Sequence, residues 1–213
     1  MNVSMTHNKS VIFWDFDGVI KDSVDIKTVA YETLFLPHGS AIASRIRQHH
    51  EANGGVSRFD KIPLYLEWAG KSATPERIEE FCQQFSLAVV QAVIDSPWVP
   101  GVREYLLGHH TDQYFVLLTA APQDEIEHII ASLGLSHCFR EIFGAPTKKE
   151  KAIESVLVNL GCPSEAALVI GDSESDVLAA LANSVPFLLR RTSLNGRLQA
   201  RYKVSVFDDF NDE

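Results

Sequence analysis

The sequence predicts an α/β fold, in which a parallel sheet is covered by helices on both faces, together with a separate segment that is all helical. Three observations support this prediction. From about residue 100 onward, short apolar runs alternate with helical patterns, which is the order typical of a parallel sheet. Residues 24–98 contain no convincing strand, and their apolar residues recur at helical spacing. Hydrophobic residues make up 46% of the 213 residues, which is enough to bury a sizeable core.

Short, continuous apolar runs are expected to form buried strands. The four clear runs are Ser10–Trp14, Tyr114–Leu118, Ala167–Ile170 and Pro186–Leu189, and Ile142-Phe143 is a shorter, weaker candidate. The segments with apolar side chains on one helical face are Asp124–Leu133, Glu150–Leu160 and Glu174–Ala182. The acidic tail FDDFNDE is expected to fray.

The stretch from Val24 to Trp98 is expected to be a helical insertion after the first strand. PWVPGV ends it with two prolines and a glycine. Asn53-Gly54-Gly55, near its middle, requires special backbone angles and indicates a loop between helices. We therefore expect two domains, one formed by residues 1–22 and 99–213 and one by residues 23–98.

Composition and charge narrow the class of partner. The net charge of −9 repels phosphate backbones, so a nucleic acid is not expected as a partner. No apolar run approaches the roughly 18 residues of a membrane span, and MNVSMTHNKS lacks the apolar stretch of a secretory signal. The three scattered cysteines fit reduced thiols. We expect a cytoplasmic protein with no membrane partner, as a monomer or homodimer.

Several polar side chains share the position directly after a predicted strand. In chain order they are Asp15 and Asp17, Thr119, Lys148 and Lys149, and Asp172 and Asp176. Ligands of open parallel sheets collect at the carboxyl ends of the strands, so we expect these side chains to meet at one edge.

Carboxylates gathered at one edge repel each other, and a hard divalent cation relieves that repulsion. Mg²⁺ takes oxygen ligands and favours phosphate as a further ligand. A carboxylate can attack phosphorus when a metal and a lysine neutralise the charge, and a second carboxylate can carry the proton. A calcium loop of the EF-hand type would need Gly and Glu where this chain has Ile20 and Ile26. The sequence therefore predicts a Mg²⁺-dependent phosphoryl-transfer site.

The order of DFDGVIKDS, a threonine after the second strand, a lysine that opens a helix and GDSESD resembles the haloacid dehalogenase superfamily of phosphohydrolases. The resemblance spans about residues 11 to 190. It implies a Rossmann-like core with a cap, and the helical insertion is similar to the C1-type cap of that family. It also implies the nucleophile at Asp15, the general acid/base at Asp17 with a metal-binding carbonyl, phosphoryl-binding groups at Thr119 and Ala120, a metal ligand at Asp172 and a supporting acid at Asp176.

The family's lysine and its substrate leave alternatives open. Both Lys148 and Lys149 fit, and we prefer Lys149 because Ala152 and Ile153 lie three and four residues after it. In the helical insertion, Arg58 could offer a bidentate fork to a second anion or a carboxylate of the substrate. The cap type implies a small phosphorylated metabolite, such as a sugar phosphate or phosphoglycolate.

Other functions remain in competition with a phosphomonoester hydrolase. A phosphomutase of the β-phosphoglucomutase kind usually has Glu-Asp in the fourth motif, whereas Gly171-Asp172 favours hydrolysis. Dehalogenases and phosphonate hydrolases of the family lack the second aspartate of the first motif, which is present here as Asp17. A non-catalytic binding module would have lost the site, but all four motifs are intact.

Overall fold

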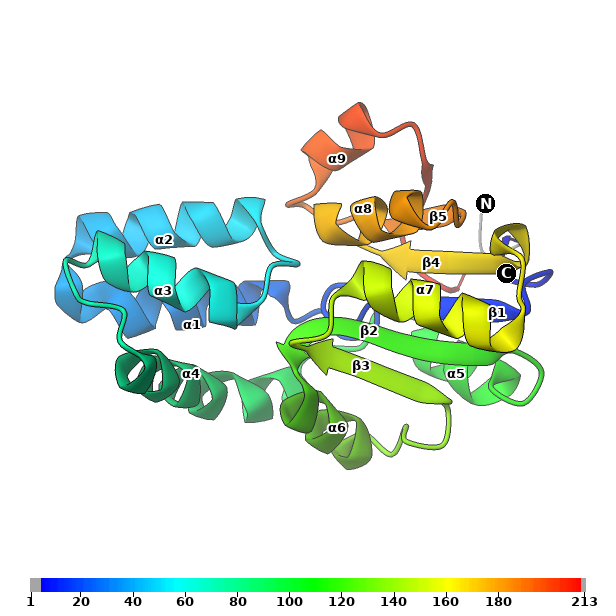
Figure 1. Cartoon of the computed structure of the whole chain (residues 1–213), viewed down its shortest axis with the longest axis horizontal. Coiled ribbons are helices and arrows are strands. Elements are labelled where there is room, and N and C mark those ends of the chain that lie inside the picture. The colour runs from blue at the N-terminus through cyan, green and yellow to red at the C-terminus, as the bar shows by residue number, and fades with distance from the viewer. Residues whose placement is uncertain (1–4, 212–213) are drawn as a thin grey trace.

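A six-stranded parallel sheet forms the centre of the computed structural model, which describes residues 5–211 (Figure 1). Its strands are β1 (Val11–Trp14), β2 (Tyr114–Pro122), β3 (Glu141–Ala145), β4 (Ala167–Gly171), β5 (Phe187–Arg190) and β6 (Ser205–Phe207). Their order across the sheet is β3-β2-β1-β4-β5-β6, and all neighbours pair in parallel. β1 is therefore central, and all its residues are buried.

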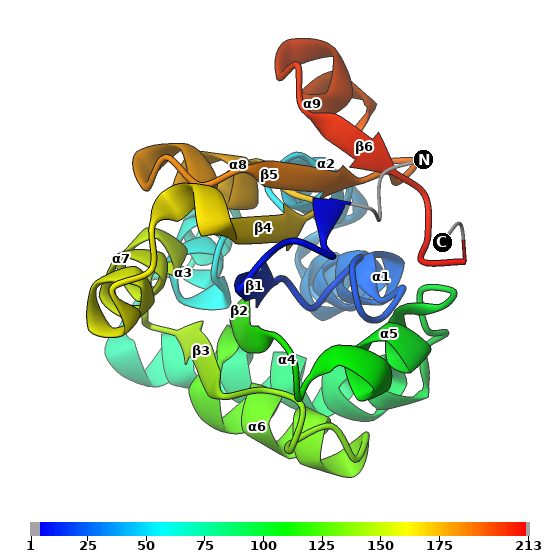
Figure 2. The same ribbon diagram turned by 90° about the vertical axis from the view of Figure 1, so that its right-hand side faces the viewer.

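Alternate residues of β1 point to opposite faces of the sheet, and each face is covered by its own helices. Those helices are α5 (Val102–His109), α6 (Gln123–Ser132), α7 (Lys149–Leu160) and α8 (Glu174–Ala182). Ile12 and Trp14 join the apolar cluster that contains α5 and α6. Val11 and Phe13 join the cluster that contains α7 and α8. Figure 2 shows the two layers on either side of the strands. A strand buried on both faces must be apolar throughout, which explains the continuous hydrophobic run.

Four α-helices follow β1 and precede α5, and α1, α2 and α3 lie beyond the carboxyl ends of the strands (Figure 1). They are α1 (Val24–Phe35), α2 (Ser40–Ala52), α3 (Arg58–Trp68) and α4 (Pro75–Asp95), with a short 3₁₀ turn, η2 (Leu36–His38), after α1. Aromatic rings hold this helical segment together. The ring of Tyr31 lies 4.0 Å from that of Phe85 and 5.4 Å from that of Tyr65, between centroids. Outside the helical segment, two further short helices are η3 (Ser164–Ala166) and α9 (Gly196–Arg201).

Two adjacent connections join the helical segment to the sheet. Lys21 and Trp98 pair in an antiparallel bridge, and the amide of Asp22 donates to the carbonyl of Pro97 over 2.9 Å. The Lys21 ammonium is buried, donates to the carbonyl of Ile94 and lies 4.4 Å from the centre of the Trp98 ring. The chain therefore leaves and re-enters the sheet layer at one place.

The predicted fold class is confirmed, and so are the predicted strands and helices. Helix α8 has the predicted bounds, and the weak candidate at Ile142-Phe143 is part of the longer β3. β2 continues to Pro122, beyond the predicted end at Leu118, because its pairing with β3 resumes after an irregular step. Among residues 5–211, no helix is long and apolar enough to cross a membrane. Residues 1–4 of MNVSMTHNKS lie outside the described residues.

The expectation that FDDFNDE frays is wrong for its described part. Phe207 ends β6, which pairs with β5, and Phe210 is buried against the rings of Trp14 and Tyr105. Two aromatic side chains remove enough apolar surface from water to outweigh the acidic residues around them. Asp212 and Glu213 lie outside the described residues.

Replacing Phe210 by alanine is expected to lower the free energy of unfolding by about 3 kcal/mol, because it leaves a cavity beside Trp14 and Tyr105. Denaturant unfolding of the full chain measures the change. Leu87→Ala is the control, since the Leu87 side chain is 85% exposed and its loss should change stability by less than about 0.5 kcal/mol. Equal effects of the two substitutions would show that the tail is not part of the core.

Candidate active site

β1 carries the first two predicted site residues to the carboxyl edge of the sheet. The amide of Asp15 donates to the carbonyl of Ile170 over 2.9 Å, and the Asp15 side chain is buried. The chain then turns at Gly18, which has a φ of +76°. A Cβ at Gly18 would collide with Oδ2 of Asp172. Glycine therefore allows both the turn and the close approach of a carboxylate from the loop after β4.

Three buried carboxylates converge beyond the strands. Asp15, Asp172 and Asp176 each offer an oxygen, and these oxygens lie within 4.8 Å of one another. Lys149, the first residue of α7, donates from Nζ to Oδ1 of Asp15 over 2.8 Å and to Oδ1 of Asp176 over 2.6 Å. The lysine is itself buried. One cation therefore holds two of the three carboxylates in place.

The electrostatics of this cluster follow from burial and from like charges. Burial, and then repulsion from Asp176, raises the pKa of Asp15 to about 7 against the opposing effect of Lys149. Burial also raises the pKa of Asp172 well above its ordinary value, and Asp15 and Asp176 add to the rise. Burial alone would lower the pKa of Lys149, but Asp15 and Asp176 raise it above the ordinary lysine value. The cluster carries more negative charge than one lysine compensates.

These residues fit Mg²⁺. All the donors are carboxylate oxygens, the ligand type that a hard divalent cation prefers, and the raised pKa values mark a surplus of negative charge. Asp176 is already engaged, because Oδ1 accepts from Lys149 and Oδ2 accepts from the hydroxyl and amide of Ser173. Among residues 5–211, no hydrogen bond to the Asp172 carboxylate is found. Asp15 and Asp172 are therefore better placed as direct ligands than Asp176.

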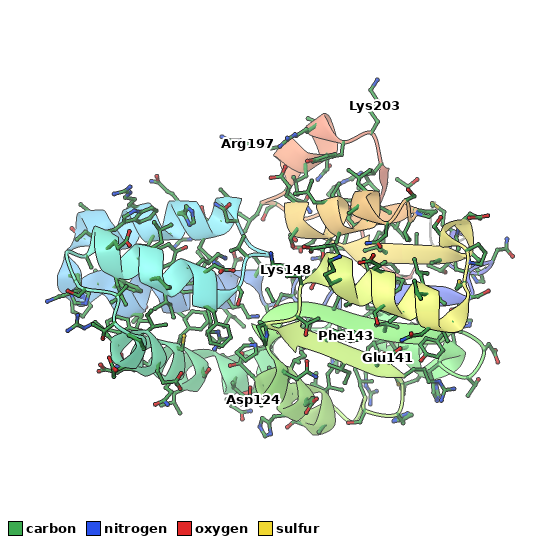
Figure 3. The ribbon with its side chains drawn as sticks, in the orientation of Figure 1. Asp124, Glu141, Phe143, Lys148, Arg197 and Lys203 are labelled. Atoms are coloured by element: carbon green, nitrogen blue, oxygen red, sulfur yellow. The ribbon has the colours of Figure 1, made fainter. Side chains whose placement is uncertain are left out.

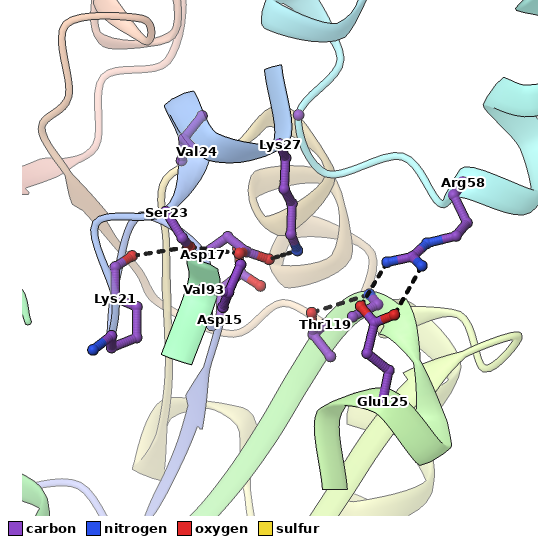
Figure 4. Close-up of polar contacts among 12 residues, drawn as sticks. Asp15, Asp17, Lys21, Ser23, Val24, Lys27, Arg58, Val93, Thr119 and Glu125 are labelled. Atoms are coloured by element: carbon purple, nitrogen blue, oxygen red, sulfur yellow. Dashed lines mark hydrogen bonds and ion pairs between the residues drawn. The ribbon is translucent and has the colours of Figure 1, made fainter. Parts of the chain in front are cut away.

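Asp17 belongs to a different network from Asp15. Ser23 Oγ donates to Oδ1 of Asp17 over 2.6 Å, and Lys27 Nζ donates to Oδ2 (Figure 4). Burial would raise the pKa of Asp17, but the charge of Lys27 and these two hydrogen bonds outweigh it and lower the pKa. Sequence reasoning missed Ser23 and Lys27. Both lie in KDSVDIK, which overlaps the end of DFDGVIKDS and continues into α1, but the sequence does not show which side of α1 faces Asp17.

Thr119 and Ala120 lie near the end of β2. Thr119 is buried, and its hydroxyl oxygen accepts a hydrogen bond from the amide of Ala121 over 3.2 Å. Ala120 lines the cavity described below.

The two candidate lysines, Lys148 and Lys149, lie apart. Lys149 contacts the carboxylates, whereas Lys148 precedes α7 and is exposed, on the side toward the helical segment (Figure 3).

Arg58 forms the predicted bidentate contact, but with a carboxylate of the protein. Its Nη2 lies 2.6 Å from Oε1 of Glu125 and its Nη1 lies 2.8 Å from Oε2, while Nη1 also donates to the hydroxyl of Ser86 (Figure 4). Glu125 occupies the fork in this conformation, and binding of a substrate anion by Arg58 stays a prediction. Sequence reasoning missed Glu125 because the two residues are 67 positions apart and meet only through packing.

A cavity of about 770 Å³ lies between the helical segment and the carboxyl edge of the sheet. Asp15, Asp17, Lys149 and Asp172 line it from the sheet side. From the other side, the loop after α2 reaches the start of α8, where a Cβ on Gly55 would collide with side chains of that segment. The helical segment thus touches the sheet layer at this loop and at the Arg58 ion pair. The site is a covered pocket that combines paired carboxylates, a buried lysine and room for a small molecule.

A family described as haloacid dehalogenase-like hydrolase matches residues 11–189. The chain is 28% identical over 181 residues to a phosphoglycolate phosphatase of Pseudomonas savastanoi pv. phaseolicola, covering 82% of this chain and 66% of that protein, slightly under two thirds of its length. It is 23% identical over 189 residues to a phosphoglycolate phosphatase of Colwellia psychrerythraea, covering 83% of this chain and 82% of that protein.

Solved structures share the fold. A predicted phosphoglycolate phosphatase from Haemophilus somnus 129pt has a TM-score of 0.73 at 19% identity, covering 96% of both chains. A beta-phosphoglucomutase from Clostridium difficile has a TM-score of 0.74 at 19% identity, covering 95% of this chain and 92% of that chain. At such low identity, these likenesses show the fold alone.

The raised pKa of Asp15 makes the stability of the metal-free protein depend on pH. Folded Asp15 keeps its proton up to about pH 7, whereas the ordinary aspartate pKa of 3.8 applies in the unfolded chain. The contribution of Asp15 to folding stability is therefore full below pH 3.8 and is lost as the pH rises through 7. Saturating Mg²⁺ should relieve the repulsion. We expect it to raise the unfolding temperature by about 5 °C or more at pH 8, and by less at pH 5.

Thermal unfolding with and without Mg²⁺ at both pH values measures the effect. Asp172→Asn is the matched variant, because it removes one carboxylate from the cluster, and its response to Mg²⁺ should be much smaller. The same response in the variant and the original chain would place the ion elsewhere.

Proposed function

The chain belongs to the haloacid dehalogenase-like hydrolase family, and we propose that it is a Mg²⁺-dependent phosphatase that hydrolyses the phosphomonoester of a small metabolite. The observation that carries the proposal is the Lys149 ammonium between Asp15 and Asp176, beside Asp172 and inside a covered cavity. That arrangement suits a negatively charged nucleophile that must approach a negatively charged phosphate. The relatives named phosphoglycolate phosphatase support the same class of reaction.

In the first proposed step, a carboxylate oxygen of Asp15 attacks phosphorus. A bond forms between this oxygen and phosphorus, the bond from phosphorus to the alcohol oxygen breaks, and the alcohol takes a proton from the carboxyl group of Asp17. Lys149 fixes the orientation of Asp15 by holding Oδ1. Thr119 and the amide of Ala120 are proposed to hold the transferring phosphoryl group.

In the second step, water attacks the aspartyl-phosphate. The bond between phosphorus and the Asp15 oxygen breaks, phosphate leaves, and Asp17 takes a proton from the water. The lowered pKa of Asp17 favours the base form that this step needs and opposes the acid form that the first step needs, so it supports the second step alone. Asp15, Asp172 and the backbone carbonyl of Asp17 would hold Mg²⁺, supported by Asp176, and the ion would neutralise charge between the phosphate and Asp15.

Residues 23–98 are proposed to form a cap over a core of residues 1–22 and 99–213. The paired connections at Lys21 and Trp98 support a hinge, and the Arg58–Glu125 ion pair supports a closed position. Closure would exclude water from the site while the substrate reacts. Arg58 also borders a small cavity beside Asp17, so we propose that it contributes to substrate binding where a substrate anion replaces Glu125.

Phosphate release from a library of phosphorylated metabolites, with Mg²⁺ and with EDTA, tests the proposed function. We expect hydrolysis of at least one small phosphomonoester that EDTA abolishes and added Mg²⁺ restores. Phosphorus NMR of the products separates free phosphate from an isomerised sugar phosphate, which would indicate a phosphomutase instead. Complete inactivity across the library would favour a binding module.

On the best substrate from this library, Arg58→Ala should raise KM about tenfold, because Arg58 is proposed to contribute to substrate binding.

Asp15→Asn is expected to lower kcat at least about 1,000-fold, because the amide cannot serve as the nucleophile. The circular dichroism spectrum and unfolding temperature should show an intact fold. Asp25→Asn is the matched control, since Asp25 is an exposed aspartate at the start of α1, and it should leave kcat unchanged. A phosphatase rate in Asp15→Asn close to that of the original chain would contradict the covalent mechanism.

A further inference from the structure

Two basic side chains are buried together inside the helical segment. Lys61 of α3 and His50 of α2 are 1% and 3% exposed, and Lys61 Nζ lies 2.9 Å from Nδ1 of His50. The other hydrogen bond of Lys61 goes to the carbonyl of Gly54 over 3.4 Å. Within residues 5–211, no carboxylate forms an ion pair with Lys61. A buried ammonium without a counter-charge is unfavourable, so this pair is unusual in a protein interior.

The other basic side chains of the helical segment near this position are compensated. Lys27 donates to the carboxylate of Asp17, and Arg58 is held by both oxygens of Glu125. Lys61 is therefore the basic group in this neighbourhood whose charge is left for something else to balance.

The contact with Lys61 decides which nitrogen of His50 carries the proton. An ammonium can only donate, so Nδ1 of His50 accepts, and the neutral ring carries its proton on Nε2. Burial, and then the charge of Lys61, lowers the pKa of His50 well below its ordinary value, which keeps the ring neutral. The ring also packs against Tyr31, with 4.8 Å between centroids, which fixes its direction.

In the part of the chain that the structure describes, Nε2 of His50 is left without a protein partner beside two cavities. His50 lines both the large cavity and a smaller one of about 30 Å³ next to it. Among the described residues, Nε2 of His50 has no hydrogen-bond partner. The one fully buried side-chain nitrogen or oxygen without a partner in that range is Nε1 of Trp14, so Nε2 of His50 is not sealed off. Nε2 is therefore the polar atom of His50 that remains available to a ligand in these cavities.

Asp17 and Ala120 line the same small cavity. Under the proposed function, Asp17 gives its proton to the alcohol oxygen, so the alcohol part of the substrate lies between Asp17 and the helical segment. This cavity measures about 30 Å³ against about 770 Å³ for the large one, so it accepts only a small group. It suits a carboxylate better than a second phosphate group.

We propose that His50 and Lys61 form a subsite for a carboxylate on the leaving alcohol of the substrate, with His50 donating from Nε2 and Lys61 supplying the charge behind it. The proposal rests on the proposed function, since it places the alcohol beside Asp17. It makes His50 a binding residue and Lys61 a positioning residue, which acts through the His50 ring and does not line the cavity.

Charge on Lys61 should make the subsite respond to pH. Burial, and then the charge of Lys27, lowers the pKa of Lys61 to about 7, while Asp17 and Asp60 act in the opposite direction. The neutral ring of His50 is the group in direct contact with Lys61. A bound carboxylate favours the ammonium form, so the affinity for a carboxylate is expected to fall as the pH rises above about 7.

The test compares two ligands on the full chain carrying Asp15→Asn, which prevents turnover. Calorimetry with Mg²⁺ measures Kd for 2-phosphoglycolate and for ethyl phosphate, which has the same carbon count without the carboxylate. We expect tighter binding of 2-phosphoglycolate, more so at pH 6 than at pH 8. Lys61→Met and His50→Leu should each lower this preference about tenfold or more, with little change for ethyl phosphate.

Two further variants separate a binding role from a structural one. His50→Gln can still present an N–H near the position of Nε2, so it should keep part of the preference that His50→Leu loses. Lys71→Met, at an exposed lysine of the same segment, should change neither affinity. Unfolding curves of each variant report whether it folds.

The outcomes are distinct. An unchanged preference in Lys61→Met and His50→Leu, or equal binding of both ligands before these substitutions, overturns the subsite and leaves the phosphatase proposal intact. An equal loss of affinity for both ligands also overturns the subsite, because such a loss indicates a structural effect of the substitution. If neither ligand binds, the subsite fails, and the metabolite library decides separately whether the proposed function stands.

Discussion

The contact on which the site depends is the Lys149 ammonium between Asp15 and Asp176. Three buried carboxylates would repel each other strongly without it, and even with it the pKa values of Asp15 and Asp172 are raised. The fold supplies the geometry: Asp15 directly follows β1, α7 begins at Lys149, and the loop after β4 brings Asp172 against Gly18. The same surplus of negative charge that strains the metal-free site makes it suited to a divalent cation.

A second set of contacts places the helical segment over that cluster. Its two connections run side by side at Lys21 and Trp98. Away from these connections, Arg58 of α3 contacts Glu125 of α6 beside the sheet. Lys27, on the first helix of this segment, reaches Asp17. The environment of Asp17 therefore depends on where the helical segment lies. If the segment moves as a cap, its closure also decides which partner Asp17 has.

The basic residues of the helical segment divide by how their charge is balanced. Lys27 and Arg58 each pair with a carboxylate of the protein. Within residues 5–211, Lys61 forms no ion pair, and it lies against the neutral ring of His50, the carbonyl of Gly54 and the ring of Tyr31. Balanced pairs hold parts of the protein together, and an unbalanced buried cation next to a cavity is better explained by a ligand. The distinction marks Lys61 as the cation left for a ligand to balance, whereas Arg58 would bind a substrate anion by giving up its contact with Glu125.

The sequence by itself determined the features that depend on local pattern. Apolar runs predicted the strands, helical spacing predicted the helices, and the rule that parallel strands end at one edge predicted that Asp15, Lys149 and Asp172 would meet there. Only the tertiary structure decided the pairs Lys27–Asp17, Arg58–Glu125 and Lys61–His50, and the burial of Phe210. Each depends on how a helix is rotated and docked against a segment distant in the chain. The spacing of residues along the chain does not determine the rotation and docking of a helix, because these depend on many weak packing contacts that form together.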